Sequence, residues 1–224
     1  MSDESLDTWL RPTPFVDSDA PTVTAFAREA AGGAADPLAR AVALYYAVRD
    51  GVTYTPYLDF RSPETYRASR VLDKRAGFCV GKAALLAAAA RAEGIPARLR
   101  FADVRNHLCT PKLRALVGTD VFYFHGLVEL HLAGRWVKAT PAFDRALCER
   151  FGVLPLEFDG REDSIFHPYD AAGRRHMEYV ADRGAHADVP VDEIRATFAR
   201  EYPELMARGA APPTRFHDEA RAAG

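Results

Sequence analysis

One of the three cysteines lies where a predicted helix begins. The alanine- and leucine-rich segment from about Cys79 to Glu93 predicts this helix, and Gly77 stands just before it. The unpaired backbone N–H groups and the positive dipole at a helix start stabilise a thiolate and lower the pKa of the thiol. The same groups stabilise the oxyanion that forms when a thiolate attacks an acyl carbon. These features indicate that Cys79 is a nucleophile; the alternative is a small buried apolar residue.

A nucleophilic thiol needs a base, and the base needs a group that orients it. Two strands, predicted over about residues 122–132 and 135–140, form a hairpin with a two-residue turn. In that register His125 and Thr140 are diagonal neighbours on the face opposite to the apolar one. If the second strand continues, the side chain of Asp144 lies on the same face as His125 and Thr140. His125 is therefore the candidate base, and either Thr140 or Asp144 is the candidate orienting residue.

Several segments around Cys79 and His125 resemble the transglutaminase-like core. The segments are Gly77–Ala83 (G-F-C-V-G-K-A), Arg91–Arg98 (R-A-E-G-I-P-A-R), His125–Leu130 (H-G-L-V-E-L) and Gly134–Val137 (G-R-W-V). The resemblance extends over about residues 71–144. It implies a papain-like fold and a Cys-His-Asp triad with Cys79 as nucleophile and His125 as base. Because Thr140 occupies the position where the family usually has the Asp, it implies a divergent, bacterial-type member rather than a protein-crosslinking enzyme.

The order of the predicted elements favours an α+β fold. Apolar periodicity predicts helices over about residues 23–31 and 37–50 before the helix of Cys79, and a period of two then predicts strands from residue 97 onward. We therefore expect helices packed on an antiparallel β-sheet, with the nucleophile at the start of a central helix. A final helix is predicted from about residues 188 to 206.

The length of 224 residues favours one domain. We expect a single transglutaminase-like domain over residues 1–224. Its core covers about residues 36–145, between an N-terminal arm over residues 1–21 and a C-terminal extension over about residues 146–224. The role of this extension is left open by the sequence.

The composition argues against several classes of partner. Lys and Arg number 29 and Asp and Glu 31, which gives a formal charge of -2 and no field that attracts nucleic acid or anionic lipid. The longest apolar run is too short to cross a bilayer and the first residues are acidic, so we expect a cytoplasmic protein without membrane or nucleic-acid partners. The sequence contains no phosphate-binding glycine motif, and we expect no cofactor.

The remaining candidate residues concern substrate and metal binding. We predict substrate contacts from Tyr54 and Tyr57, which lie in a proline-broken loop, and from Asn106 and His107, which follow the strand after the central helix. A zinc site is disfavoured because the spacing of the Cys and His residues fits no standard pattern, and we expect no metal. The residues taken to have no role are Cys109, Cys148, His131, His167, His176, His186 and His217, the last four of which we expect to face solvent.

The chemistry that these residues predict is acyl transfer through a thiol. Cys79 attacks an amide, ester or thioester carbonyl of a peptide or small molecule and forms an acyl-thioenzyme. Release to water makes a hydrolase, a peptidase or amidase, which we favour slightly. Release to an amine makes a transglutaminase-type acyltransferase, and internal release an acyl cyclase. A hypothesis of another class is an inactive binding module on the same fold.

Overall fold

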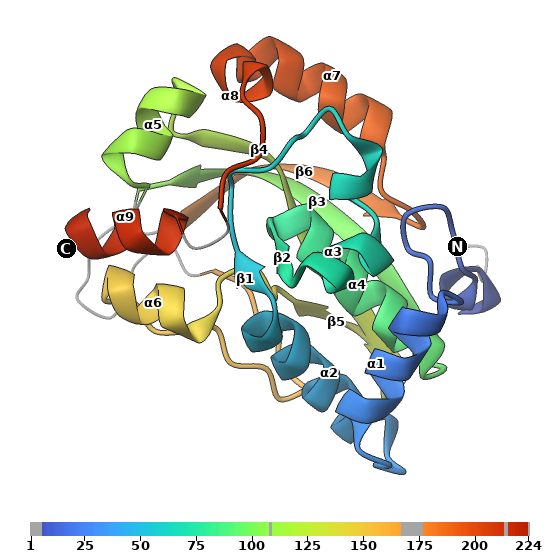
Figure 1. Cartoon of the computed structure of the whole chain (residues 1–224). Helices are drawn as coiled ribbons and strands as arrows, with labels where there is room; N and C mark the ends of the chain where they lie inside the picture. Colours follow the sequence, from blue (N-terminus) through green and yellow to red (C-terminus); the bar gives the residue numbers. More distant parts are fainter. Residues whose placement is uncertain (1–5, 108, 167–176, 213–214, 224) are drawn as a thin grey trace.

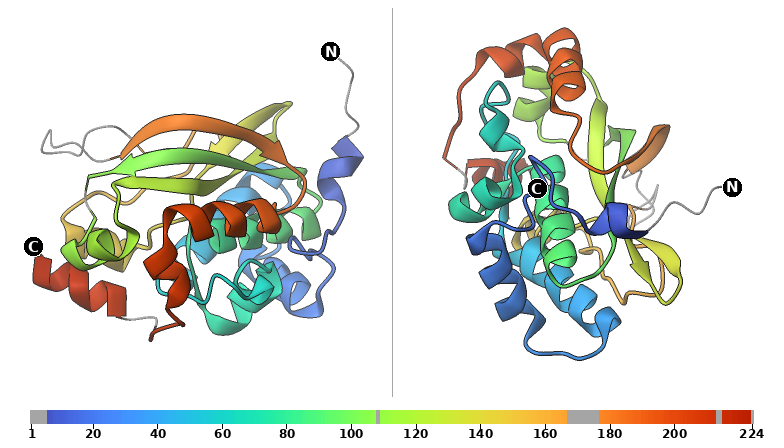
Figure 2. Two further views of the ribbon diagram at one scale, coloured as in Figure 1. Left: turned by 90° about the horizontal axis from the view of Figure 1, so that it is seen from above. Right: turned by 90° about the vertical axis from the view of Figure 1, so that its right-hand side faces the viewer.

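A computed structural model describes residues 6–107, 109–166, 177–212 and 215–223. The α-helices cover one face of a four-stranded sheet with strand order β5-β4-β3-β6 (Figures 1 and 2). This arrangement is the α+β, papain-like fold that the sequence predicts. Two predicted solvent-facing residues, His167 and His176, lie outside the described residues.

The helical elements begin with a short 3-10 helix and continue to the C-terminal end of the described chain. They are η1 (Leu6–Leu10), α1 (Pro21–Ala31), α2 (Pro37–Gly51), η2 (Pro63–Thr65), α3 (Ala68–Lys74), α4 (Cys79–Ala92), α5 (Pro111–Val117), α6 (Arg145–Phe151), α7 (Val191–Glu201), α8 (Pro203–Ala207) and α9 (Arg215–Ala223). The helix expected over residues 188–206 is therefore two helices. Tyr202 separates them, because Pro203 cannot donate the backbone hydrogen bond that a continuous helix needs.

The sheet is antiparallel throughout. Its strands are β3 (Ala97–Asn106), β4 (Val121–Leu132), β5 (Arg135–Ala139) and β6 (Met177–His186). The predicted hairpin register is confirmed, because Leu132 pairs with Arg135 across the turn. A second, parallel pair joins β1 (Thr53–Tyr54) to β2 (Ala76–Gly77) directly before α4.

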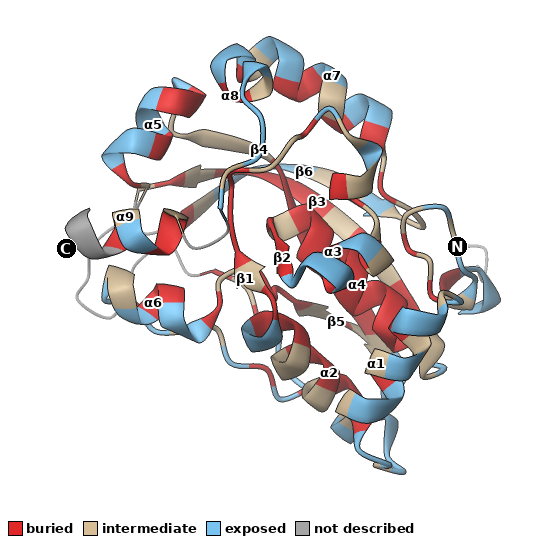
Figure 3. Ribbon diagram, viewed as in Figure 1, coloured by how far each residue is buried: buried red, intermediate tan, exposed pale blue. Residues whose placement is uncertain are grey.

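Helix α4 is the buried centre of the molecule. Its residues from Val80 to Arg91 are all buried (Figure 3), because the alanines let helices α1, α2 and α3 on one side and strand β4 on the other approach closely. Lys82, fully buried on this helix, donates to the carbonyl oxygens of Arg49 (2.9 Å) and Val52 (2.6 Å) at the end of α2. Burial lowers the pKa of Lys82 to about 7.

Candidate active site

The position of Cys79 is fixed by what precedes it. Backbone bonds from β1 to β2 hold the chain up to Gly77, and α4 then begins at Cys79 with Phe78 as its extended N-cap residue. A Cβ atom on Gly77 would lie 2.9 Å from Val71 Cγ1, so only glycine fits this approach. The first turn of α4 is thereby aimed at the sheet.

Strand β4 crosses directly over the start of α4. A Cβ atom on Gly126 would lie 2.9 Å from Val80 Cα and 3.2 Å from Val80 N. The absent side chain therefore allows backbone to pack on backbone at this crossing. Because His125 is the neighbour of Gly126, the crossing brings the imidazole to the same end of the helix as the Cys79 thiol.

The backbone before His125 has an unusual conformation. Phe124 has φ +56°, in the left-handed region, and β4 carries one residue more than β3 here, since Ala102 pairs with His125 and Val104 with Phe122. The buried carboxylate of Asp103 accepts the Phe124 N–H at 3.1 Å.

Arg183, on β6, holds that carboxylate from the other side. Its Nε and one terminal nitrogen donate to the two oxygens of Asp103 at 2.6 and 2.9 Å. The guanidinium carbon also lies 4.1 Å from the ring centroid of Phe124, within cation–π range. The ion pair and the ring contact together stabilise the bulge that presents His125.

The Cys79 side chain is a protonated thiol at neutral pH. Burial raises its pKa to about 11, although the backbone N–H groups of Gly126 and Val80 act in the opposite direction. The N–H groups at the helix start do lower this pKa, as expected, but desolvation exceeds their effect and the net shift is upward. The two N–H groups beside the sulfur remain available to an oxyanion that forms on an acyl group bound there.

The imidazole of His125 is neutral at ordinary pH. Burial lowers its pKa to about 4, and the ring centroid lies 5.5 Å from that of Phe166. Within the described part of the chain, its buried Nε2 atom has no hydrogen-bond partner. A neutral imidazole is the form that accepts a proton from a thiol.

Cys79 and His125 line one pocket. Its other walls are mostly aromatic and aliphatic, and they come from the loop after β1, from β3 and β4, and from the later helices α5, α7 and α8. Tyr54 and Asn106, two of the four candidate substrate-binding residues, belong to its lining. The other two candidates lie elsewhere: Tyr57 lines a neighbouring hollow, and His107 faces Glu178 at 3.3 Å.

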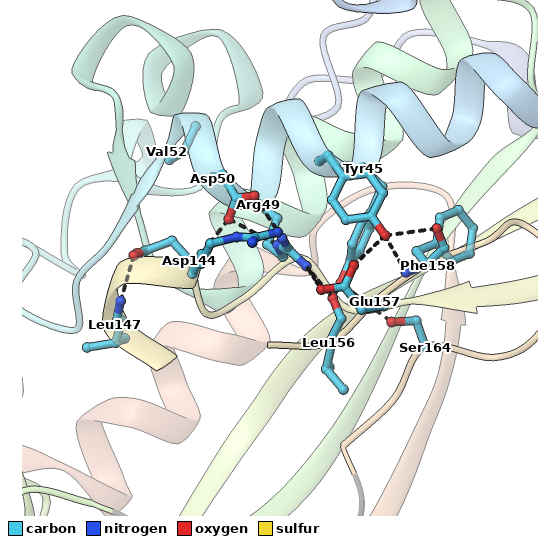
Figure 4. A network of polar contacts seen from close by, with 12 residues as sticks. Tyr45, Arg49, Asp50, Val52, Asp144, Leu147, Leu156, Glu157, Phe158 and Ser164 are labelled. Atoms are coloured by element: carbon cyan, nitrogen blue, oxygen red, sulfur yellow. Dashed lines mark hydrogen bonds and ion pairs between the residues drawn. The ribbon is translucent and has the colours of Figure 1, made fainter. Parts of the chain in front are cut away.

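Neither candidate orienting residue bonds to His125. Thr140 is buried, and the side chain recorded beside it is Tyr179, not His125. Asp144 instead caps α6: it accepts the N–H of Leu147 (3.0 Å) and of Tyr54 (2.9 Å). Figure 4 shows it at the edge of a polar network around α2, which identifies a structural role for this carboxylate.

His217, expected to face solvent, is the side chain that Asp144 does bind. Its Nε2 atom lies 3.1 Å from Oδ2 of Asp144, and both side chains are buried. Phe216, the preceding residue, packs on the rings of Tyr54 and Tyr57. The pair therefore attaches α9 to the wall of the pocket.

Sequence reasoning missed the supports of the site. Asp103 and Arg183 carry no motif, because they lie 80 residues apart and meet only through the pairing of β3 with β6. The pocket walls on α7 and α8 were also missed. The signal that points to them is the apolar spacing of Phe198, Tyr202 and Leu205.

No metal-binding cluster and no membrane-spanning helix is found in the part of the chain that the structure describes. No three or more His, Cys, Asp or Glu side chains gather closely enough among those residues to hold an ion. None of the helices in that part is both long and apolar enough to cross a bilayer.

A thiol at the start of a buried helix and a histidine on the crossing strand thus line one pocket. The model of the transglutaminase-like superfamily matches residues 24–141 of this sequence. The chain belongs to that superfamily, and membership supports a cysteine enzyme in general. A comparison with curated proteins found no match.

Two solved structures are similar to this chain. One is named "Putative Cysteine Protease" from Cytophaga hutchinsonii; the TM-score is 0.48, the identity 19%, and the match covers 82% of this chain and 55% of that one. The other is named "Putative Protease" from Parabacteroides distasonis; the TM-score is 0.39, the identity 17%, and the match covers 60% of this chain and 25% of that one. The match thus spans about half of the first relative and a quarter of the second.

Proposed function

We propose that the protein is a cysteine hydrolase that cleaves an amide, ester or thioester of a peptide or small molecule through an acyl-thioenzyme on Cys79. The observation that carries the proposal is the shared pocket of Cys79 and His125, with the Gly126 and Val80 N–H groups beside the sulfur. Family membership supports a cysteine enzyme in general. That the acyl group is released to water, and not to an amine, is part of this proposal.

The first half of the reaction forms the thioester. The Cys79 proton passes to the imidazole of His125 as the sulfur attacks the carbonyl carbon, and the carbonyl electron pair moves to the oxygen. The N–H groups of Gly126 and Val80 donate to this oxyanion. When the carbonyl re-forms, the bond to the leaving group breaks, and the imidazolium gives its proton to the leaving nitrogen, oxygen or sulfur.

The second half restores the enzyme. His125 takes a proton from water as the water oxygen attacks the thioester carbon, and the carbonyl electron pair again moves to the oxygen. When the carbonyl re-forms, the carbon–sulfur bond breaks and a carboxylic acid leaves. The sulfur then recovers its proton from His125, so no cofactor is consumed.

The ground state of this pair is neutral. With the thiol pKa raised to about 11 and the imidazole pKa lowered to about 4, transfer of the proton before attack is unfavourable. Proton transfer therefore accompanies attack on the carbonyl, as in general-base catalysis. The imidazolium that forms during attack has no Asp or Glu beside it among the described residues that line the pocket.

The test is acyl-enzyme formation followed by intact-protein and peptide mass spectrometry. Wild type treated with a p-nitrophenyl ester should gain one acyl group on Cys79 and lose it again in water. His125→Ala should acylate roughly 10²–10⁴-fold more slowly, the usual contribution of a general base. Cys109→Ala is the matched control and should behave as wild type.

The alternatives give different outcomes. Acyl-Cys79 that is stable in water and released by an added amine identifies an acyltransferase instead of a hydrolase. Release as a cyclic product identifies an acyl cyclase. Absence of acylation with every ester, amide and thioester tried, in wild type as in Cys79→Ala, would overturn the proposal and leave a binding module.

A further inference from the structure

We infer that the pocket of Cys79 and His125 binds an uncharged, apolar acyl group and thereby selects the substrate. The inference rests on the proposed function, because it places the acyl part of the substrate beside the sulfur to which that part becomes bonded. It concerns recognition, however, and can be tested without turnover.

The walls of this pocket carry no formal charge. Among its described lining residues there is no Asp, Glu, Lys or Arg, and the polar members are Cys79, His125, Asn106 and tyrosines. The apolar walls include Phe60, Phe78, Leu113, Val117, Phe198 and Leu205. A charged group placed here would lose its hydration without gaining an ion pair, which is unfavourable.

The hydroxyl group of Tyr202, which lines the pocket, already makes two hydrogen bonds within the protein. Tyr202, between α7 and α8, donates its hydroxyl proton to the carbonyl oxygen of Val121 (2.8 Å) and accepts the N–H of Tyr123 (2.7 Å). Both bonds are made to the backbone of β4, which lies at the same pocket. Tyr202 therefore offers its ring to a ligand, and not its polar end.

Several of these walls lie outside the region that the family model matches. That region ends at residue 141, whereas Phe198, Tyr202 and Leu205 lie on or between α7 and α8. These helices lie together with α5 over one end of the sheet (Figure 1). Residues 191–207 thus give the C-terminal extension a function, which is to complete the acyl pocket.

A neighbouring hollow provides the contrast. It is lined by Lys112, Glu204, Arg208 and Arg215 together with Leu116, and it contains neither Cys79 nor His125. Both hollows use α5: Leu113 and Val117 face the catalytic pocket, and Leu116 faces the charged one. The helix therefore separates an apolar site at the thiol from a charged site away from it.

The size of the pocket suits a short acyl chain. The part of it that the centre of a water-sized sphere can reach measures about 50 Å³, and one water molecule needs roughly 10–15 Å³ of such space. Each methylene buried contributes about 0.8 kcal/mol, which corresponds to roughly a fourfold gain in affinity per methylene. Affinity should therefore rise with acyl length until the pocket is full.

The first experiment measures binding to the Cys79→Ala protein, which forms no thioester. The ligands are acetamide, butanamide, hexanamide and adipic acid monoamide, followed by methyl chemical shifts in NMR titrations. We expect affinity to rise roughly fourfold for each added methylene. The adipic monoamide, which has the hexanamide chain with a terminal carboxylate, should bind at least tenfold more weakly than hexanamide.

A matched pair of variants on α5 locates the binding. Val117→Ala, made in the Cys79→Ala protein, enlarges the catalytic pocket and should shift the preference from hexanamide towards octanamide by roughly fourfold. Leu116→Ala, which enlarges the charged hollow, should leave that preference unchanged. Thermal unfolding of each variant, measured in parallel, shows whether it is folded.

The outcomes separate this inference from the proposed function. Equal affinities for acetamide, hexanamide and the adipic monoamide would overturn the apolar pocket even if Cys79 forms an acyl-enzyme. A shift caused by Leu116→Ala and not by Val117→Ala would overturn its location. Length-dependent binding in a protein that never acylates would support the pocket and reject the hydrolase.

Discussion

The carboxylate of Asp103 binds the guanidinium of Arg183 through two hydrogen bonds, and the same carboxylate accepts the N–H of Phe124. Phe124 has a positive φ and directly precedes His125. A non-glycine residue in this conformation is unfavourable by roughly 1–2 kcal/mol, so it persists only where neighbouring contacts hold it. The Asp103–Arg183 pair therefore helps to set the direction in which His125 leaves the strand.

Asp103→Asn should weaken both the fold and the reaction. The variant keeps an acceptor for the Phe124 N–H but loses the ion pair. We expect the free energy of unfolding to fall by about 2 kcal/mol, less than for a fully buried pair because Arg183 is partly exposed. Acylation of Cys79 should slow by a larger factor than unfolding explains. Urea denaturation and acylation rates at a temperature where both proteins are folded give the two quantities.

Asp182→Asn is the control for this variant. Asp182 also lies on β6 and pairs with an arginine, Arg100, but at the exposed surface. Its loss should change stability by less than about 0.5 kcal/mol and leave acylation unchanged. Equal effects of the two variants would contradict a positioning role for Asp103.

The alkylation of Cys79 by iodoacetamide should be slow at neutral pH and rise about tenfold per pH unit towards pH 11. The reason is that burial raises the pKa of this thiol to about 11, so little thiolate exists at pH 7. Burial raises the pKa of Cys109 and Cys148 further, to about 12, so these thiols should label more slowly. Peptide mass spectrometry across pH 6–11 measures all three.

His125→Ala should leave this alkylation profile unchanged, because a neutral imidazole does not stabilise the thiolate. Rapid labelling of Cys79 at pH 6 that disappears in His125→Ala would contradict a resting state in which the Cys79 thiol and the His125 imidazole are both neutral. It would show a thiolate–imidazolium pair instead.

The acid limb of the acylation rate should lie near pH 4. Burial lowers the pKa of His125 to about 4, and the base is lost only when the ring becomes protonated below that value. The same shift affects stability. The unfolded imidazole titrates near 6.5, so the contribution of His125 is complete above pH 6.5 and decreases as the pH falls towards 4. A pH–rate profile from pH 3 to 8 tests the limb, and a midpoint near 6.5 would contradict it.

Cys79 and His125, which line one pocket, could be predicted from sequence to belong together because they lie in local patterns. Gly77, Cys79 and the alanine-rich segment define a helix start without tertiary information. The alternation of the hairpin predicts the register of β4 with β5, which the structure has from Val128–Ala139 to Leu132–Arg135, since a slip of one residue would expose the apolar face. His125 lies beyond this pairing and pairs instead with Ala102 of β3. Local periodicity therefore determined which side chains share a face.

Partners that depend on long-range contacts could not be predicted in this way. Counting along a continued strand predicts Asp144 near His125, but β5 ends at Ala139, before Pro141, and α6 begins at Arg145. The Asp144 carboxylate then meets His217, 73 residues away, because α9 packs on α6. The net pKa of Cys79 could not be predicted either, since the helix start that lowers it is visible in the sequence and the walls that raise it by burial are not.

His217→Asn should lower stability near neutral pH by about 1–3 kcal/mol, the usual effect of removing a buried hydrogen-bond partner. Burial alone raises the pKa of Asp144, but bonds from His217 and the Tyr54 N–H and the charge of Lys82 exceed it and hold the pKa below 3.8. The stabilisation from Asp144 is therefore present above pH 3.8 and is lost as the pH falls through its folded pKa. Urea denaturation from pH 7 to 3 should show the difference between variant and wild type shrinking in acid. A difference that persists unchanged at pH 3 would contradict this account.

Gly126→Ala should displace strand β4 from the start of α4. The added Cβ atom would lie 2.9 Å from Val80 Cα, and both contacting groups are backbone, so neither can rotate away. We expect a loss of about 1–3 kcal/mol in stability, typical of overpacking, and a loss of acylation because the Gly126 N–H moves away from the sulfur. Gly209→Ala is the control, since a Cβ atom there meets nothing within 4 Å. A Gly126→Ala protein that unfolds and acylates like wild type would show that the close crossing is not needed to hold His125 beside Cys79.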